Sequence, residues 1–190
     1  ANANIAGPFR NNGSVTGPTT GALTISGPLS GNGVFTGLVT AEHNLAPGES
    51  IGSMRFDSLT LGEQSVFKVE IAGNLRGGQA QFGDETDLQL GGYDWIDVLD
   101  ALTLGGDLEI VLDGYTPQLG DVFDLFDADT VAGGFDQILR PGLDEALMWD
   151  TSTLEQDGKL RVALIPEPAT MTILAIGGWL ATSGRRRRDG

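Results

Sequence analysis

The chain has 190 residues, no cysteine and a net charge of −15 at pH 7. The missing cysteines exclude disulfides, thiolate metal sites and cysteine nucleophiles, and the acidic balance argues against nucleic acid or anionic lipid as partners. Glycine is abundant, at 29 residues, and aromatic residues make up only 7%, which is typical of many turns that join many short strands.

The first residues carry no export signal. The chain begins at Ala1 and shows no basic segment followed by an apolar one, as a secretory signal would require. We expect a signal and further sequence upstream. Residues 1–164 would then be a Gly-rich extracellular region that is truncated at its N-terminus.

Alternation of apolar and polar residues with period two predicts three half-buried strands, at residues 65–71, 107–112 and 159–164. The side chains expected to face the core are Phe67, Val69 and Ile71 in the first strand, Leu108, Ile110 and Leu112 in the second, and Leu160, Val162 and Leu164 in the third.

A weak internal repeat accompanies these strands. The sequence Leu-Thr-Leu-Gly at 59–62 recurs at 102–105, and residues 23–25 are a shorter copy. The offsets of 36 and 43 residues correspond to about two turns of a solenoid with roughly 20 residues per turn. Because one turn cannot bury its inner face alone, stacking would supply the core. We therefore predict an all-β, parallel β-helix or solenoid-like fold, with a β-sandwich as the alternative.

Residues 45–52, Leu-Ala-Pro-Gly-Glu-Ser-Ile-Gly, resemble a recurrent turn of autotransporter-like β-helix proteins. Residues 93–98, 104–108 and 119–123 are similar to the same repeat region. The resemblance spans roughly residues 30–165 and implies a β-helix architecture. Because that family includes adhesins, proteases and proteins without known activity, it implies no particular chemistry.

Catalytic residues are not evident. His43 is the sole histidine, which excludes a site with several histidines, and no Gly-x-Ser-x-Gly motif accompanies it. Paired carboxylates can cleave glycans, but the acidic region between Arg76 and Arg140 contains no basic residue that would hold a sugar. We expect Tyr93 and Trp95 to pack in the core. We therefore predict no enzymatic activity, and the alternative is a fragment of an extracellular polysaccharide-active β-helix enzyme.

Two acidic clusters offer oxygen ligands of the kind that Ca²⁺ prefers. The candidate ligands are Asp84, Asp87, Asp121, Asp124 and Asp127. Neither cluster fits the EF-hand loop or the repeat of calcium-binding β-rolls. We expect these side chains to keep the surface soluble and to block edge-to-edge pairing of strands. No cofactor is then required, and weak calcium binding is the alternative.

The C-terminal region combines three features. Pro166, Glu167 and Pro168 precede the sixteen uncharged residues 169–184, and four arginines follow. Sixteen helical residues span about 24 Å, a little less than a hydrocarbon core, and long arginine side chains can reach its surface. We predict a short transmembrane helix over 169–184. Flanking basic residues stay cytoplasmic, so the preceding chain would lie on the outer side.

This order of features resembles the PEP-CTERM sorting tail of bacterial surface proteins. Pro166, Glu167 and Pro168 match the signature tripeptide. The basic terminus is matched by Arg185, Arg186, Arg187 and Arg188. The resemblance covers residues 165–190 and implies recognition by an exosortase-like membrane processing enzyme near the tripeptide. It also implies export and association with extracellular polysaccharide.

These features predict an exported, non-enzymatic surface or extracellular-matrix protein of structural or adhesive function. Its C-terminal helix would anchor it in the inner membrane before processing. The body would lie on the outer side and would finally reside at the cell surface or in the extracellular matrix.

Overall fold

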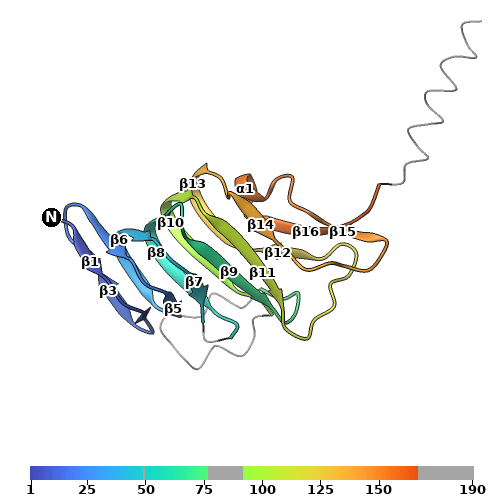
Figure 1. Cartoon of the computed structure of the whole chain (residues 1–190), viewed down its shortest axis with the longest axis horizontal. Helices are drawn as coiled ribbons and strands as arrows, with labels where there is room; N and C mark the ends of the chain where they lie inside the picture. The colour runs from blue at the N-terminus through green and yellow to red at the C-terminus, as the bar shows by residue number, and fades with distance from the viewer. Residues whose placement is uncertain (49, 77–91, 167–190) are drawn as a thin grey trace, which may run out of the picture.

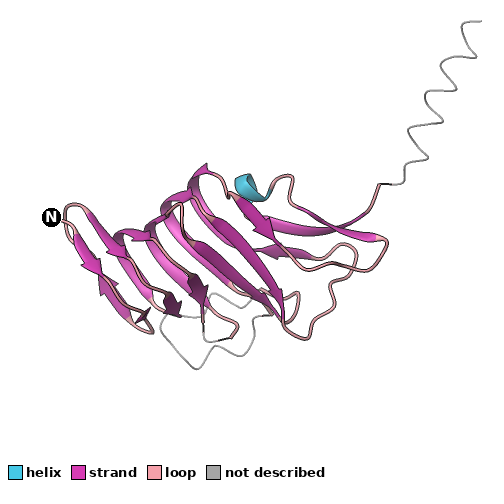
Figure 2. Cartoon of the chain, viewed as in Figure 1, coloured by secondary structure: helices cyan, strands magenta, loops and turns pink. Residues whose placement is uncertain are grey.

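The structure is a computed structural model that describes residues 1–48, 50–76 and 92–166. These residues are mostly β-strand, and the one helix among them is the short α1 (Leu154–Asp157) (Figure 2). The all-β prediction is therefore confirmed for this part of the chain. The helix predicted over 169–184 lies outside the described residues. Within the described ranges, no helix has the length and apolar character needed to cross a membrane.

Most strands belong to two parallel sheets, which we call sheet A and sheet B (Figure 1). Sheet A contains, in spatial order, β1 (Ala3–Ile5), β4 (Ala22–Ile25), β6 (Val34–Ala41), β8 (Ser53–Leu61), β10 (Trp95–Leu104) and β13 (Phe126–Gly133), with β3 (Ser14–Thr16) beside β6. Sheet B contains β2 (Phe9–Arg10), β5 (Leu29–Gly31), β7 (Leu45–Pro47), β9 (Val66–Ile71), β11 (Asp107–Leu112) and β14 (Gln137–Leu139). From β1 to β11 the chain alternates between the two sheets, except that the consecutive strands β3 and β4 both belong to sheet A.

A third, antiparallel sheet lies at the C-terminal end of this stack (Figure 1). This sheet C contains β12 (Val122–Asp124), β16 (Lys159–Leu164) and β15 (Leu147–Asp150), with β16 in the centre. Phe123, Trp149 and Leu160 bury their side chains in the common core. Sheet C and α1 therefore cover the C-terminal end of the stack.

Inward-facing side chains form columns that run from strand to strand. One column of sheet A contains Leu23, Val39, Leu59 and Leu102. One column of sheet B contains Leu29, Leu45, Phe67 and Leu108. All of these side chains are buried. Because successive strands place apolar residues at the same register, each strand covers the inner face of its neighbour.

The three strands predicted from alternation are confirmed as β9, β11 and β16. Their predicted core residues are buried with two exceptions. Leu112 is half-buried and packs against the core. Leu164 is 56% exposed, because it pairs with Leu147 beyond the last buried pair of the β15–β16 ladder, Trp149 and Val162.

The internal repeat has a different spacing from the one expected. Leu102 pairs directly with Leu59, so the 43-residue offset corresponds to neighbouring strands and not to two turns. That expectation was wrong because the long passage 72–94 lies between β9 and β10. The 36-residue offset does correspond to two steps, since Leu23 pairs with Val39, which pairs with Leu59.

The column structure predicts a large cost for truncating an inward aromatic residue. Phe56 is fully buried and stacks on Phe35 with ring centroids 5.1 Å apart. Phe56→Ala should lower the free energy of unfolding by about 3–5 kcal/mol, because it leaves a cavity between neighbouring strands. Urea unfolding followed by circular dichroism measures this change. Leu38→Ala, at a position of sheet A that is 40% exposed, is the control and should cost less than about 1 kcal/mol. Equal losses of unfolding free energy in the two variants would contradict the inward position of Phe56.

Candidate functional site: a polar groove on sheet B

A polar groove of about 310 Å³ lies on the outward face of sheet B. Its lining residues are Arg10, Ser30, Ala46, Pro47, Gly48, Ser50, Lys68, Glu70 and Asp94. Arg10, Ser30 and Ala46 are register partners on β2, β5 and β7, and Lys68 continues the same row on β9. Since their strand neighbours Leu29, Leu45 and Phe67 face the core, period-two alternation turns this row outward.

The turn after β7 forms one wall of the groove. Gly48 has a positive φ of 80°, a conformation that glycine adopts without strain. Its backbone N–H donates to the carbonyl oxygen of Gly31 over 2.7 Å. Residues 45–48, the described start of the segment that resembles an autotransporter-like turn, therefore pack against the preceding strand of sheet B and shape the groove.

Asp94 lies beside the groove and is almost fully buried, with 1% of its surface exposed. One carboxyl oxygen accepts the Gly52 N–H over 2.7 Å, and the other accepts the Glu70 N–H over 2.9 Å. Burial raises the pKa of Asp94 to about 8, the backbone donors and Lys68 oppose the shift, and the Glu70 carboxylate adds to it. At pH 7 the Asp94 carboxyl is therefore mostly protonated.

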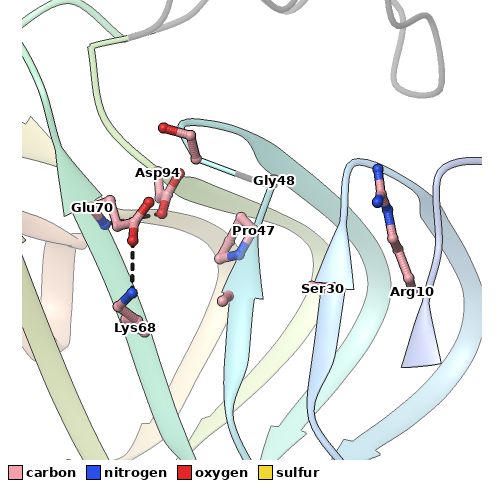
Figure 3. Close-up of a pocket in the computed structure, with 9 residues that line it drawn as sticks. Arg10, Ser30, Pro47, Gly48, Lys68, Glu70 and Asp94 are labelled. Atoms are coloured by element: carbon pink, nitrogen blue, oxygen red, sulfur yellow. Dashed lines mark hydrogen bonds and ion pairs between the residues drawn. The ribbon is translucent and has the colours of Figure 1, made fainter. Parts of the chain in front are cut away.

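Glu70 and Lys68 provide the ionised pair of the groove. Lys68 Nζ lies 2.6 Å from Glu70 Oε1, and this hydrogen bond raises the pKa of Lys68 against the effect of burial. Glu70 and Asp94 lie side by side, whereas Arg10 stands at the other end of the row (Figure 3). The groove thus combines a neutral carboxyl, a carboxylate and two cationic side chains.

Two carboxyl groups with different protonation states are the arrangement that general acid–base chemistry requires. Asp94, however, directs both oxygens to backbone N–H groups and is almost inaccessible to solvent. Its evident role is to hold the turn before β8 and the strand β9 against the start of β10. Glu70 is the more accessible member, since 24% of its side chain is exposed.

Sequence reasoning did not single out Lys68, Glu70 or Asp94 as a site. The contact between Gly52 and Asp94 joins residues 42 positions apart, and no local pattern indicates it. One signal was present: Asp94 stands between Tyr93 and Trp95, which were both expected in the core and are each 2% exposed. An acidic residue between two core aromatic residues predicts a buried carboxyl with specific hydrogen-bond partners.

The calcium candidates Asp124 and Asp127 lie against Arg76. Its Nη1 is 2.8 Å from Asp124 Oδ2 and its Nη2 is 2.7 Å from Asp127 Oδ2. The guanidinium also lies 3.9 Å from the ring centroid of Trp95, in cation–π geometry. The acidic region itself contains no basic residue, but Arg76, which precedes it, reaches carboxylates 48 and 51 residues further along the chain.

Asp124 and Asp121 differ in their protonation behaviour. Burial raises the pKa of Asp124, the nearby Arg76 opposes this shift, and Asp127 adds to it. Burial would also raise the pKa of Asp121, but hydrogen bonds from Gln118, Tyr115 and Asn74 outweigh it and lower that pKa. Within the described ranges, no group of three or more potential ligands is placed to hold a metal ion. Asp84 and Asp87 lie outside these ranges, and calcium binding stays a prediction.

The remaining predicted positions are only partly described. His43 is exposed, and its Nδ1 accepts the N–H of Asn44. Pro166 is exposed at the end of the described chain. Glu167, Pro168 and the arginines 185–188 lie outside the described residues, so the sorting motif and the membrane helix stay predictions.

Comparisons with protein-family models, with curated proteins and with solved structures found no match. The function of the chain is therefore inferred from its own residues and geometry.

The buried carboxyl of Asp94 predicts a pH-dependent stability. Its folded pKa of about 8 exceeds its ordinary value of 3.8, so the folded protein retains a proton that the unfolded chain releases. This contribution to the free energy of unfolding is fully present below pH 4 and is lost as the pH rises through 8, by roughly 2 kcal/mol or more.

Asp94→Asn removes this titration. The amide places an NH2 donor, in place of an oxygen, against one of the two backbone N–H groups, so the variant should be less stable at pH 5 by about 1–3 kcal/mol. Its stability should then change less between pH 5 and pH 9 than that of the wild type. Urea unfolding at both pH values measures the difference, and parallel pH profiles would contradict the proposed protonation of Asp94.

Proposed function

We propose that the chain is a non-enzymatic, acidic β-solenoid module that is exported and presented outside the cell as a short stalk or matrix component. The observation that carries this proposal is the in-register stacking of inward columns through successive strands of sheets A and B. A body built this way is stiff along the stack, because each strand is hydrogen-bonded to the next and shares its core. Stiffness suits a spacer more than a catalyst that must close on a substrate.

The solenoid arrangement is favoured over a β-sandwich by the strand directions. Sandwiches are built mainly from antiparallel strands, whereas within the described ranges the strands of sheets A and B pair with one another in parallel. The chain also alternates between the two sheets, which favours a coil that advances by one strand of each sheet per turn.

The charge of the body indicates the class of partner. Residues before 169 hold seven basic and 25 acidic side chains, a net charge of −18. Three of those basic residues, Arg55, Arg76 and Arg161, form ion pairs with aspartates. Nucleic acid would be repelled, and a neutral or basic extracellular polysaccharide is the partner that the surface fits best.

The tail would deliver this body. In the proposed route the uncharged segment 169–184 stops in the inner membrane, and Arg185 to Arg188 hold its end on the cytoplasmic side. An exosortase-like enzyme then acts near Pro168 and transfers or releases the body to the cell surface or the extracellular matrix. The exposed position of Pro166, beyond the last strand, supports access of such an enzyme.

Replacement of Pro166, Glu167 and Pro168 by alanine tests this route. The variant should keep its fold, because Pro166 is exposed and follows the last strand, but it should remain full-length in the inner membrane fraction. Pro117→Ala, remote from the tail in sequence, is the control and should be processed like the wild type. Immunoblotting of membrane and surface fractions measures both outcomes. Normal processing of the triple variant would overturn the proposal.

A second candidate function is glycan cleavage, and the pair Glu70 and Asp94 in the groove favours it. The non-enzymatic proposal expects no new reducing ends when the full chain is incubated with polysaccharides. Glycan cleavage that is lost in Glu70→Gln would establish the second function. Glu109→Gln is the matched control, because Glu109 is the register partner of Lys68 on β11 but does not line the groove.

A further inference from the structure

Exposed apolar side chains gather at the end of the stack where the described chain stops. Leu139, Met148 and Ile165 are 46%, 36% and 48% exposed. Soluble surfaces seldom expose several large apolar side chains together unless the surface meets a partner. We call these three residues the apolar foot.

The members of the foot are neighbours in the fold. Leu139 and Met148 line one open groove of about 520 Å³ together with Ile138, Pro141, Leu143 and Trp149. On the outward face of sheet C, Met148 pairs with Ala163, and Ile165 lies two residues beyond Ala163 on the same face. The N–H of Ile165 donates to the carbonyl oxygen of Ala146, one residue before β15. The foot is therefore one surface, formed by the end of β14, β15 and the residue that follows β16.

The sequence that follows the foot indicates its partner. Pro166 follows Ile165 directly, and the uncharged segment begins three residues later, at Ala169. Three residues span at most about 10 Å. If segment 169–184 inserts into a bilayer, Pro166 must lie within about that distance of the membrane surface, and Ile165 of the foot is its direct neighbour.

We propose that the apolar foot rests on the outer surface of the membrane in which residues 169–184 are inserted. This inference depends on the proposed membrane insertion of the tail. The foot inserts its side chains among the lipid headgroups, so that the stack stands on the membrane with its first strands furthest away (Figure 1). Such a contact orients the body and presents the segment around Pro166 at a fixed height.

Charges around the foot set the kind of membrane that it fits. Arg140 lines the groove and can donate to lipid phosphates, whereas Asp144 and Glu145 are exposed just before β15. The two carboxylates would be repelled by a strongly anionic surface. The foot therefore fits a bilayer of zwitterionic lipid, and its affinity falls as anionic lipid is added.

Site-directed spin labelling of the full chain in phosphatidylcholine vesicles tests the inference. Because the chain has no cysteine, single variants Met148→Cys, Leu38→Cys and Ala175→Cys each carry one nitroxide. Met148 and Leu38 are similarly exposed, at 36% and 40%, but Leu38 lies on β6, towards the other end of the stack (Figure 1). Collision rates with oxygen and with a water-soluble nickel chelate report the depth of each label.

The label at 175 should be shielded from nickel, and the label at 148 should collide with nickel about threefold or more less often than the label at 38. If 175 is shielded but 148 matches 38, the foot does not contact the membrane, and the inference fails while the anchor stands. If 175 is freely accessible to nickel, the membrane anchor and the inference fail together. Adding Ile165→Glu to the variant labelled at position 148 should restore nickel access to that label. An unchanged collision rate would also contradict the membrane contact of the foot.

Discussion

The structure depends on the continuity of its inward columns. A side chain such as Val39 is covered by the strand before it, the strand after it and the facing sheet. Burial of one such residue contributes roughly 1.5–3 kcal/mol, and the contribution exists only while its neighbours stay in register. A one-residue slip in any strand would turn its apolar residues outward. This requirement explains why a chain with few aromatic residues and many short strands can hold one core.

The same requirement applies at the C-terminal end of the stack, where the last columns need another element to cover them. The last columns meet sheet C, where Phe123, Trp149 and Leu160 complete the core. Arg76 ties the passage after β9 to this end through Asp124 and Asp127 and through the ring of Trp95. The backbones of Gly73 and Gly92 also lie close together at the two ends of this passage, since a Cβ atom on Gly92 would lie 2.5 Å from the backbone of Gly73. The side chains that sheet C leaves exposed lie next to the point where the tail begins, which connects the fold to the proposed delivery.

Local patterns and spatial contacts differ in how far the sequence could predict them. Alternation correctly placed Phe67, Val69 and Ile71 inward, because the side chains of one strand obey a fixed period of two. The repeat indicated stacking but gave the wrong spacing for residues 59–62 and 102–105, because sequence distance does not distinguish an extra turn from a long passage between strands. The contacts of Asp94 with Gly52 and of Arg76 with Asp124 join residues more than 40 positions apart. They follow from the register of the stack and leave no local signature.

The most direct test of delivery by the tail is the C-terminus of the mature protein. Intact mass and a peptide map of the native protein, recovered from its own cell surface, would identify it. A C-terminus near Pro168 is the predicted result and would establish the tail as a sorting signal that is removed. A C-terminus at Gly190 would contradict processing and would make residues 169–184 a permanent anchor.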